Sequence, residues 1–365
     1  MEQFCQDNAK IAIVGAGPAG IYCALQILDE LPNCKIVIFD KGQILRTILP
    51  TGGGRCNLTN SIVDIKEFAS NYPRGEKFLY SLFSRHFNSD STDFFNKIGI
   101  KTYTQEDGRI FPKSNSAKDV KDKMLNALKK YKNVKLVNKN VASKDDLSGF
   151  DRIIISAGSR GVENLLESLK QPFKPFKKAL CALKVKDFNY PKGVSVYSLD
   201  GDFVFTNDGI SGPLAFKISS LNVNKKFPYR ISINLFDVEK LYELISLNSK
   251  KSIGNLVSNL IPKSLAQVII EDFDKKAAEV SKKNIEKYSI LNLEIVDCAP
   301  AGEIVNSGGV ELNSIDKNCK SKISENLWFC GEILDIDGFC GGFNLQNCWS
   351  SAYVVAKDVI RSIIK

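Results

Sequence analysis

Apolar and polar positions alternate in blocks along the first forty residues of the chain. A short apolar run, IAIV at residues 11–14, leads into the glycine-rich turn GAGPAG at 15–20 and then into a segment with helical apolar spacing, IYCALQILDEL at 21–31. A second apolar run, KIVIFD, ends at Asp40. Short apolar runs bounded by turns are typical of buried strands. The pattern therefore predicts a strand, a helix and a second strand over residues 10–40.

Residues 41–176 continue this alternation of helical and strand-like patterns. Residues 64–98 have apolar positions at helical spacing and end at Gly99, which predicts one helix. The segment KTYTQEDGRIFP at 101–112 predicts a hairpin with Asp107-Gly108 as its turn. Further elements are expected as a helix over 116–131, capped by Ser116, and strands over 134–143 and 151–159.

The pattern changes near residue 177. Three segments between 179 and 236 alternate or run apolar between turn residues, which predicts a small β-rich unit, and 237–287 has mainly helical spacing. After about residue 300 the chain returns to glycine-rich turns, a strand in NLWFCGE and a last helix at about 345–363. We therefore expect an α/β protein in which residues 1–176 and 301–365 form one nucleotide-binding domain, and residues 177–300 form an insert on the substrate side.

The turn between the first two predicted strands has the spacing of a dinucleotide-binding fingerprint. Gly15 permits a tight turn, Gly17 lets backbone approach a pyrophosphate, and Gly20 lets the helix pack closely on the strand. The helix N-terminus offers unpaired N–H groups and a positive dipole end to phosphate. Asp40, twenty residues after Gly20, is placed to accept from a ribose hydroxyl and would repel a 2′-phosphate, which favours FAD or NAD. The alternative is a glycine-rich turn that binds nothing.

A second glycine-rich stretch, TGGGRCNLTN, covers residues 51–60. Consecutive glycines let backbone pass close to a flat or charged ligand and can form a concavity lined by N–H groups. Arg55 adds a positive charge suited to phosphate, and Asn57 and Asn60 are placed to cap turns or to face the ligand. The alternative is a flexible glycine loop.

A third stretch, GEILDIDGFCGGFNLQ, covers residues 331–346. The carboxylate of Glu332, at the end of a predicted strand, can accept hydrogen bonds from a polyol chain. A helix that begins near Asn344 would present its positive end to the N1–C2=O edge of a flavin and stabilise the charge of the reduced form. The alternative is an ordinary strand–loop–helix junction that Asn344 caps.

Composition narrows the range of functions. The 365 residues suffice for two domains, and no apolar run approaches the roughly 20 residues that span a bilayer. The first residues lack the basic and apolar regions of a signal peptide, so we expect a cytoplasmic protein. The ten cysteines include no CxxC pair, which is typical of reduced, buried thiols. With a single histidine, His86, expected on a helix surface, the sequence predicts neither a metal site nor a Ser-His-Asp hydrolase.

The formal net charge is +9, from 50 basic and 41 acidic residues. Much of the lysine lies on predicted helix faces, and the simpler interpretation is a solvated surface. The alternative is attraction to phosphate-rich partners. No nucleic-acid motif and no cluster of basic and aromatic residues stands out in the sequence.

Five segments together resemble one known family: GAGPAG, TGGGRCNLTN, GRIFPKS, TNDGISGP and GEILDIDGFCGGFNLQ. In this combination the chain resembles the bacterial NAD(P)/FAD-dependent oxidoreductases that are often named aminoacetone-oxidase-family FAD-binding enzymes, a family that includes a bile-acid Δ4,6-reductase. The resemblance runs nearly end to end. It implies a Rossmann-like FAD-binding domain of the glutathione-reductase-like, two-dinucleotide-binding-domain type, with an inserted β-barrel plus helical domain. It also implies FAD as the bound nucleotide.

The resemblance further implies roles for individual residues. The second stretch would lie along the pyrophosphate and flavin, and Ala157 and Gly158 would pass close to the pyrophosphate. Val141 would lie near the adenine, Gly331 and Glu332 would hold the ribityl chain, and the start of the last helix would contact the isoalloxazine edge. Together with the fingerprint, the candidate cofactor-binding residues are Gly15, Gly17, Pro18, Ala19, Gly20, Asp40, Lys41, Gly53, Gly54, Arg55, Cys56, Asn57, Val141, Ala157, Gly158, Gly331, Glu332, Asp335, Gly342, Phe343, Asn344 and Leu345.

Two departures from the family pattern bear on the substrate side. The family usually has Thr-His-x-Gly-x-Ser-Gly-Pro, whereas this chain has Asn207 at the histidine position, followed by Asp208. If that histidine transfers a proton in relatives, Asp208 or Asn207 would serve here. The glycine- and serine-rich stretch that usually follows the second nucleotide strand is replaced by SRGVENLLESLKQPFKPF. Cys56 beside a flavin is a third catalytic candidate, but no partner cysteine is near it in sequence, which favours a structural role.

The leading functional hypothesis is a FAD-dependent oxidoreductase that transfers hydride between flavin N5 and a small organic substrate, with NAD(P)H as reductant. Otherwise the substrate itself would reduce the flavin, with O2 as acceptor. The alternatives are a flavoprotein that acts on RNA, as in tRNA modification, and a non-catalytic flavin-binding protein. The sequence predicts no membrane partner, and it identifies neither the substrate nor the oligomeric state.

Overall fold

The computed structural model describes residues 9–299 and 305–364. The chain divides into two compact units: residues 1–177 with 306–365, and residues 178–305. The sequence predicted the first boundary after residue 176, and the second predicted boundary, after residue 300, lies outside the described residues. Each unit has its own hydrophobic core, as expected of an insert that folds around its own apolar residues.

The first unit is built on a parallel sheet of five strands, in the order β16 (Leu327–Phe329), β7 (Arg152–Ile155), β1 (Lys10–Val14), β2 (Lys35–Asp40) and β6 (Val134–Asn138). Val14 lies opposite both Phe39 of β2 and Ile155 of β7, so the three central strands end at one level. In sheets of this type a nucleotide binds at the carboxyl end, where neighbouring connections leave in opposite directions. The predicted Rossmann-like α/β fold is confirmed, and it places the candidate crevice at the end of β1.

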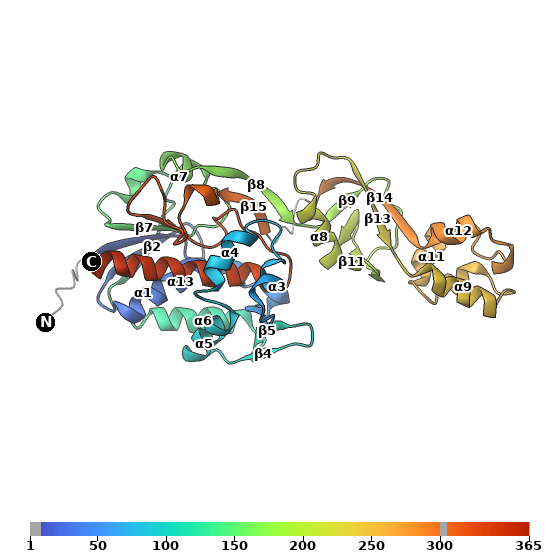
Figure 1. Cartoon of the computed structure of the whole chain (residues 1–365), viewed down its shortest axis with the longest axis horizontal. Coiled ribbons are helices and arrows are strands. Elements are labelled where there is room, and N and C mark those ends of the chain that lie inside the picture. The colour runs from blue at the N-terminus through green and yellow to red at the C-terminus, as the bar shows by residue number, and fades with distance from the viewer. Residues whose placement is uncertain (1–8, 300–304, 365) are drawn as a thin grey trace. The chain divides into compact units, whose positions relative to one another are not determined.

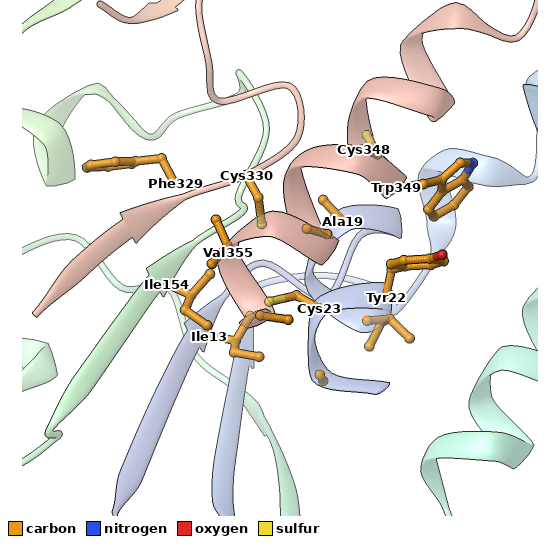
Figure 2. Packing of buried hydrophobic residues seen from close by; sticks show 14 of the residues in the cluster. Ile13, Ala19, Tyr22, Cys23, Ile154, Phe329, Cys330, Cys348, Trp349 and Val355 are labelled. Carbon is orange, nitrogen blue, oxygen red and sulfur yellow. The ribbon is translucent and has the colours of Figure 1, made fainter. Parts of the chain in front are cut away.

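Two helices from opposite ends of the chain, α1 (Pro18–Glu30) and α13 (Phe343–Ile364), pack against each other (Figures 1 and 2). The rings of Tyr22 and Trp349 lie 5.2 Å apart between centroids, and both side chains are fully buried. The last helix therefore completes the domain that the first strand begins. Among the described helices, none combines the length and the apolarity that crossing a bilayer requires.

His86 is not on a helix surface, as the sequence predicted, but in the core. Its side chain is 4% exposed, its Nε2 lies 2.8 Å from the Tyr22 hydroxyl, and its ring stacks on that of Tyr353 at 4.2 Å. Burial lowers the pKa of His86 to about 4, so the imidazole is neutral at pH 7. The histidine thus fills the interior between helices and is kept there by a hydroxyl partner.

The segment 64–98, predicted as one helix, forms three: α3 (Ile65–Ala69), α4 (Glu76–Phe83) and α5 (Asn88–Lys97). Pro73 and Gly75, whose φ is +87°, separate the first two, and Phe87 in extended backbone separates the others. Apolar spacing alone did not show these breaks, because the apolar positions on both sides of each break face the same core.

Smaller elements complete the first unit. The predicted hairpin is confirmed: β4 (Thr102–Thr104) pairs antiparallel with β5 (Arg109–Pro112), which also pairs with β3 (Thr59–Asn60). The strands β8 (Phe173–Leu180) and β15 (Val305–Val310) form a two-stranded ribbon. The remaining elements are α2 (Thr51–Gly54), α6 (Ala117–Leu128), α7 (Glu163–Ser168) and 3-10 turns at Arg46–Ile48, Lys144–Leu147 and Leu312–Ser314.

The second unit contains an antiparallel sheet of six strands, in the order β10 (Ser195–Ser198), β11 (Gly201–Phe205), β12 (Gly209–Ser211), β9 (Leu183–Val185), β14 (Ile290–Cys298) and β13 (Tyr229–Asn234). Its two edges meet at one end, where the N–H of Leu199 donates to the carbonyl oxygen of Asn234 at 2.9 Å. The sheet is therefore a partly closed barrel. Its helical elements are α8 (Pro213–Leu221), α9 (Val238–Leu247), α10 (Ile253–Val257), α11 (Lys263–Ile269), α12 (Lys282–Tyr288) and the 3-10 turn Ala277–Glu279.

The fold brings together cysteines that are far apart in the sequence. The side chains of Cys23 and Cys330 lie near each other in the first unit (Figure 2), and those of Cys181 and Cys298 are neighbours in the second. All the described cysteines are free thiols, and most are buried, as expected from their apolar contexts. Cys340, which is exposed, is an exception, and Cys5 lies outside the described residues.

Candidate dinucleotide and flavin site

The turn that joins β1 to α1 is tightly packed at two of its three fingerprint glycines. Gly15 has a φ of +107°, and a β-carbon there would lie 2.5 Å from the carbonyl oxygen of Ser156. A β-carbon on Gly20 would lie 2.0 Å from the carbonyl oxygen of Gly15. A larger residue at either position would push the helix away from the strands, so packing alone requires these two glycines.

The third fingerprint glycine, Gly17, has open space beside it. A β-carbon there would meet only Oγ1 of Thr47, at 3.9 Å. Gly17 is the N-cap of α1, no side chain bonds the first-turn N–H groups, Pro18 follows at the first helical position, and the first turn has no acidic residue. Unpaired N–H groups at the positive end of a long helix, next to open space, fit a pyrophosphate.

Asp40, at the end of β2, is hydrogen-bonded to the backbone around the turn. Its Oδ2 accepts from the N–H of Ala16 and its Oδ1 from the N–H of Gly42, both at 2.7 Å. Each carboxylate oxygen can accept a further bond, so the predicted contact with a ribose hydroxyl is compatible with this arrangement. The neighbouring candidate Lys41 donates its Nζ to the carbonyl oxygen of Arg160 at 3.1 Å.

The second glycine-rich stretch runs through left-handed backbone. Gly52, Gly53 and Gly54 have φ angles of +58°, +68° and +84°, and no atom lies within 4 Å of a β-carbon built on Gly53. The guanidinium of Arg55 lies 4.1 Å from the centroid of the Phe111 ring. The glycine backbone has no side chains that would keep a ligand away, and the Phe111 ring orients the positive charge of Arg55 beside it. This combination fits a flat or charged ligand.

The second and third glycine-rich stretches lie against each other. Gly342 has a φ of +95°, and a β-carbon there would lie 2.5 Å from the carbonyl oxygen of Thr59. With the amide of Asn57 oriented to satisfy its neighbours, its oxygen accepts from the N–H of Gly342 and its nitrogen donates to the oxygen of Thr59, both at 2.9 Å. Oγ1 of Thr59 is buried and has no hydrogen-bond partner among the described residues, which leaves one acceptor or donor for a ligand.

The third stretch also touches the first. Gly331 has a φ of +79°, and a β-carbon there would lie 2.6 Å from Cβ of Ala19, in the first turn of α1. The N–H of Gly331 donates to Oγ of Ser351 on α13 at 2.9 Å. All three stretches that the sequence assigned to one dinucleotide therefore meet at the carboxyl end of β1, and their open glycines and unpaired amides fit FAD.

Glu332 follows directly and is half-buried. Burial raises the pKa of Glu332 to about 7, an effect that Arg160 opposes and Asp337 reinforces. Hydroxyl groups that donate hydrogen bonds stabilise a carboxylate that is partly removed from water. Glu332 therefore suits the predicted bonds to a polyol chain.

We expect the stability of the flavin-free protein to fall as pH rises from about 5 to above 7, and the Glu332→Gln variant to lack part of this fall. The pKa of Glu332 is about 7 in the folded protein against an ordinary value of 4.5, so the folded state binds more protons between these values and the unfolding free energy decreases with pH. Between pH 5 and a pH above 7, the unfolding free energy of the parent should fall by about 1–3 kcal/mol more than that of Glu332→Gln. Urea unfolding at pH 5 and pH 8 measures it. The exposed Glu325→Gln is the control, and equal pH dependence in parent and Glu332→Gln would contradict the assignment.

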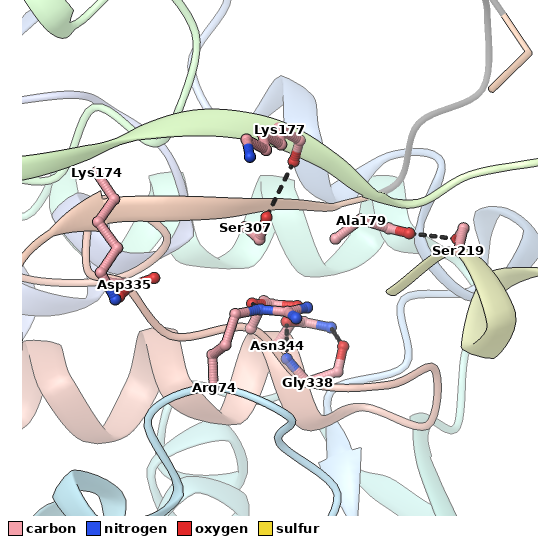
Figure 3. A network of polar contacts seen from close by, with 10 residues as sticks. Arg74, Lys174, Lys177, Ala179, Ser219, Ser307, Asp335, Gly338 and Asn344 are labelled. Carbon is pink, nitrogen blue, oxygen red and sulfur yellow. Dashed lines mark hydrogen bonds and ion pairs between the residues drawn. The ribbon is translucent and has the colours of Figure 1, made fainter. Parts of the chain in front are cut away.

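The loop between β16 and α13 is braced by basic residues that the sequence analysis did not identify (Figure 3). Arg74 forms a two-pronged ion pair with Asp337, whose side chain is completely buried. Nζ of Lys174 lies 2.6 Å from Oδ2 of Asp335. Neither basic residue belongs to a glycine-rich motif, so spacing offered no signal for them.

Three candidate residues use their side chains within this loop. Asp335 is held by the lysine just described. Oδ1 of Asn344 accepts from the N–H of Gly338 at 2.8 Å, and its Nδ2 donates to the oxygen of Gly338 at 2.7 Å (Figure 3). Phe343 is buried edge-on against Phe68. These side chains shape the loop, and contact of the segment with the flavin stays a prediction.

The remaining cofactor candidates divide into open and buried positions. Cα of Ala157 would lie 2.6 Å from a β-carbon on Gly15, and Gly158, with a φ of +68°, has nothing within 4 Å of such an atom. Val141 and Leu345 are buried in the core of the first unit. The open positions flank the β1–α1 turn, where the pyrophosphate is expected.

The catalytic candidates receive different support. Cys56 is fully buried, and burial raises the pKa of its thiol to about 12, so it is protonated at neutral pH and unsuited to nucleophilic or redox chemistry. Asn207 and Asp208 lie in the second unit, in the turn between β11 and β12, where Asp208 is 3.3 Å from Nζ of Lys184. A proton-transfer role for Asp208 or Asn207 stays a prediction.

Known proteins resemble this chain over nearly its whole length. The profile of the HI0933-like protein Rossmann domain matches residues 9–358. The ribosomal RNA dihydrouridine synthase of Escherichia coli is 27% identical and is aligned over 95% of this chain and 97% of its own. The 3-dehydro-bile acid delta(4,6)-reductase of Clostridium scindens is 24% identical over 95% of this chain and 98% of its own. The structure of 3-ketosteroid delta1-dehydrogenase from Sterolibacterium denitrificans, 10% identical, superposes with a TM-score of 0.53 over 98% of this chain and 100% of that one, which shows a shared fold.

Proposed function

This chain belongs to the HI0933-like family of Rossmann-domain, FAD-binding oxidoreductases, and from that membership we propose that it is a reductase that uses NAD(P)H to saturate a carbon–carbon double bond conjugated to a carbonyl group. When bound, FAD supplies a carrier that takes hydride from the nicotinamide and passes it to the substrate. Each double bond consumes one NAD(P)H and one proton: the hydride adds to one carbon and the proton to the other.

The convergence of the three glycine-rich stretches carries the FAD part of the proposal. The uncapped start of α1 and the open space at Gly17 and Gly158 would hold the pyrophosphate. Glu332 would hold the ribityl chain, and the junction of Thr59 with Gly342 would lie beside the flavin. These residues bind and orient the cofactor, and they exclude water from one side of it.

The names of two relatives support the bond type. Dihydrouridine is uridine whose C5–C6 double bond, conjugated to the C4 carbonyl, has been saturated, and one relative is named for making it. The other is named for reducing double bonds conjugated to a 3-oxo group. Both substrates accept hydride at the carbon remote from the carbonyl, because the carbonyl stabilises the charge that develops.

We place a uracil base in RNA first as substrate and a small enone second. The relative named for RNA matches at the higher identity, over 97% of its length. The net charge of +9 favours a polyanionic substrate. This order reverses the one that the sequence alone favoured, where a small molecule came first.

An anaerobic titration of the flavin absorbance with NADH and then NADPH tests the proposal, followed by addition of unmodified ribosomal RNA transcript or of a 3-oxo-Δ4 steroid. We expect one nicotinamide to bleach the flavin and RNA to restore it, with dihydrouridine found by mass spectrometry of the nucleosides. Recovery with the steroid alone would favour the second substrate. A flavin that neither nicotinamide bleaches would overturn the NAD(P)H part, and failure to bind FAD would overturn the whole.

A further inference from the structure

A basic and aromatic loop of the second unit follows α8 and includes the first two residues of β13. Its residues are Lys225, Lys226, Phe227, Pro228, Tyr229 and Arg230, and we call them the KKFPYR loop. The first four are exposed, and so is Arg230, whose side chain is 88% accessible. From residue 209 to residue 236 the chain contains four basic residues and no acidic one. The loop therefore lies in a stretch of uniformly positive charge.

The two rings of the loop form a small stack beside a cation. The centroids of Phe227 and Tyr229 are 5.4 Å apart with 23° between their planes, and Nζ of Lys225 lies 5.5 Å from the centroid of Tyr229. Phe227 is 42% exposed, although burial of a phenylalanine would stabilise the fold. An accessible ring on a stack with lysines around it can receive an unpaired base and its phosphates.

The charged residues around the KKFPYR loop have a net positive charge. Glu294 on β14 lies 3.5 Å from Nε of Arg230 and 3.0 Å from Nζ of Lys186, which directly follows β9, so one carboxylate is shared by two cations. Lys225 and Lys226 form no ion pair with any carboxylate in the described part of the chain. Lys225 and Lys226 can therefore bind an anion. The cluster of Glu294, Arg230 and Lys186 adds one net positive charge beside them.

We propose that the KKFPYR loop binds an unpaired segment of RNA, with phosphates on Lys225 and Lys226 and a base stacked on Phe227. The inference rests on the proposed action on RNA and adds the surface that holds the substrate outside the flavin site. Phosphate contacts supply affinity that depends on salt, and stacking supplies affinity that does not.

Binding of a fluorescein-labelled 20-nucleotide oligouridylate to the full-length holoprotein tests the proposal across a series of salt concentrations. We expect Lys225→Glu/Lys226→Glu to raise Kd at least 10-fold and to lower the salt slope by about 1.4, the value for two phosphates on a single strand. Phe227→Ala should raise Kd about 5- to 100-fold and leave the slope unchanged. The control, Lys250→Glu/Lys251→Glu, changes the same charge at another exposed lysine pair of the second unit and should leave Kd within about two-fold.

Equal effects of the two lysine double variants would overturn the inference, because net charge and not the loop would then determine binding. The same holds if the parent binds no oligouridylate at low salt. The proposed function is read separately, from bleaching of the flavin by NAD(P)H and from dihydrouridine in the parent's RNA product. The parent protein could form dihydrouridine while the two lysine double variants have the same Kd. That result would support the proposed function and exclude the KKFPYR loop as the RNA-binding surface.

Discussion

The Gly17→Ala variant is expected to fold as the parent does and to lose most of its affinity for FAD. A β-carbon at Gly17 meets only Oγ1 of Thr47, at 3.9 Å, so the protein itself accommodates the methyl group. That methyl group occupies the space at the start of α1 where we place the pyrophosphate, and it keeps the charged oxygens from the first-turn N–H groups. Hydrogen bonds to charged groups are worth about 1.5–3 kcal/mol, so Kd for FAD should rise about 10- to 100-fold.

Fluorescence titration of the flavin-free protein with FAD measures that affinity, and thermal unfolding of the same samples shows whether the fold is kept. Gly149→Ala is the control for FAD affinity, since no atom lies within 4 Å of a β-carbon there and Gly149 is outside the candidate site. Gly20→Ala should fail by misfolding, because its β-carbon would lie 2.0 Å from a backbone oxygen. FAD binding at the parent's affinity in Gly17→Ala would show that the pyrophosphate lies elsewhere.

The Arg74→Met variant is expected to lose about 3–5 kcal/mol of unfolding free energy, the cost of leaving a buried charge without its main partner. Asp337 has 0% of its side chain exposed, whereas Arg74 keeps 22%. The loop that Asp337 anchors joins β16 to α13, so the variant should also hold FAD less well. Urea unfolding followed by tryptophan fluorescence measures the loss in the relevant part, because Trp328 and Trp349 both lie in the first unit.

Adding Asp337→Asn to Arg74→Met should restore much of the lost stability, because asparagine carries no charge for Arg74 to neutralise. Lys97→Met provides the comparison with an exposed ion pair, where Lys97 and Asp29 are 64% and 51% exposed and the expected loss is below about 1 kcal/mol. Equal losses in Arg74→Met and Lys97→Met would contradict the importance of the buried pair.

Backbone features of the candidate site were predictable from the sequence, whereas side-chain partners were not. The fingerprint specified Gly15 and Gly20 because only glycine permits that turn and that helix–strand distance. The sequence left open whether Asn344 contacts the flavin or caps the strand–loop–helix junction, and it gave no sign that the Asn344 side chain would bond Gly338. The hydrogen-bond partner of a side chain depends on residues that come close to it only in the folded chain.

His86 and the KKFPYR loop illustrate the same limit. The helix pattern around His86 gave no sign that Tyr22, 64 residues earlier, would supply a hydroxyl and draw the ring into the core. The basic and aromatic residues 225–230 are adjacent in sequence, but only their stacking and exposure distinguish them from other lysine-rich segments. Contacts distant in sequence, and the surface that remains uncovered, are properties of the tertiary structure.

The paired strands β8 and β15 have an evolutionary consequence. The chain leaves the first unit through one strand of this ribbon and returns through the other, so the two ends of the second unit start from neighbouring positions, about 5 Å apart as paired strands are. A domain whose ends adjoin can be exchanged, lengthened or lost with little entropic penalty to its host. The second unit can therefore change in length and sequence over evolution while the parallel sheet that carries the nucleotide fingerprint is kept.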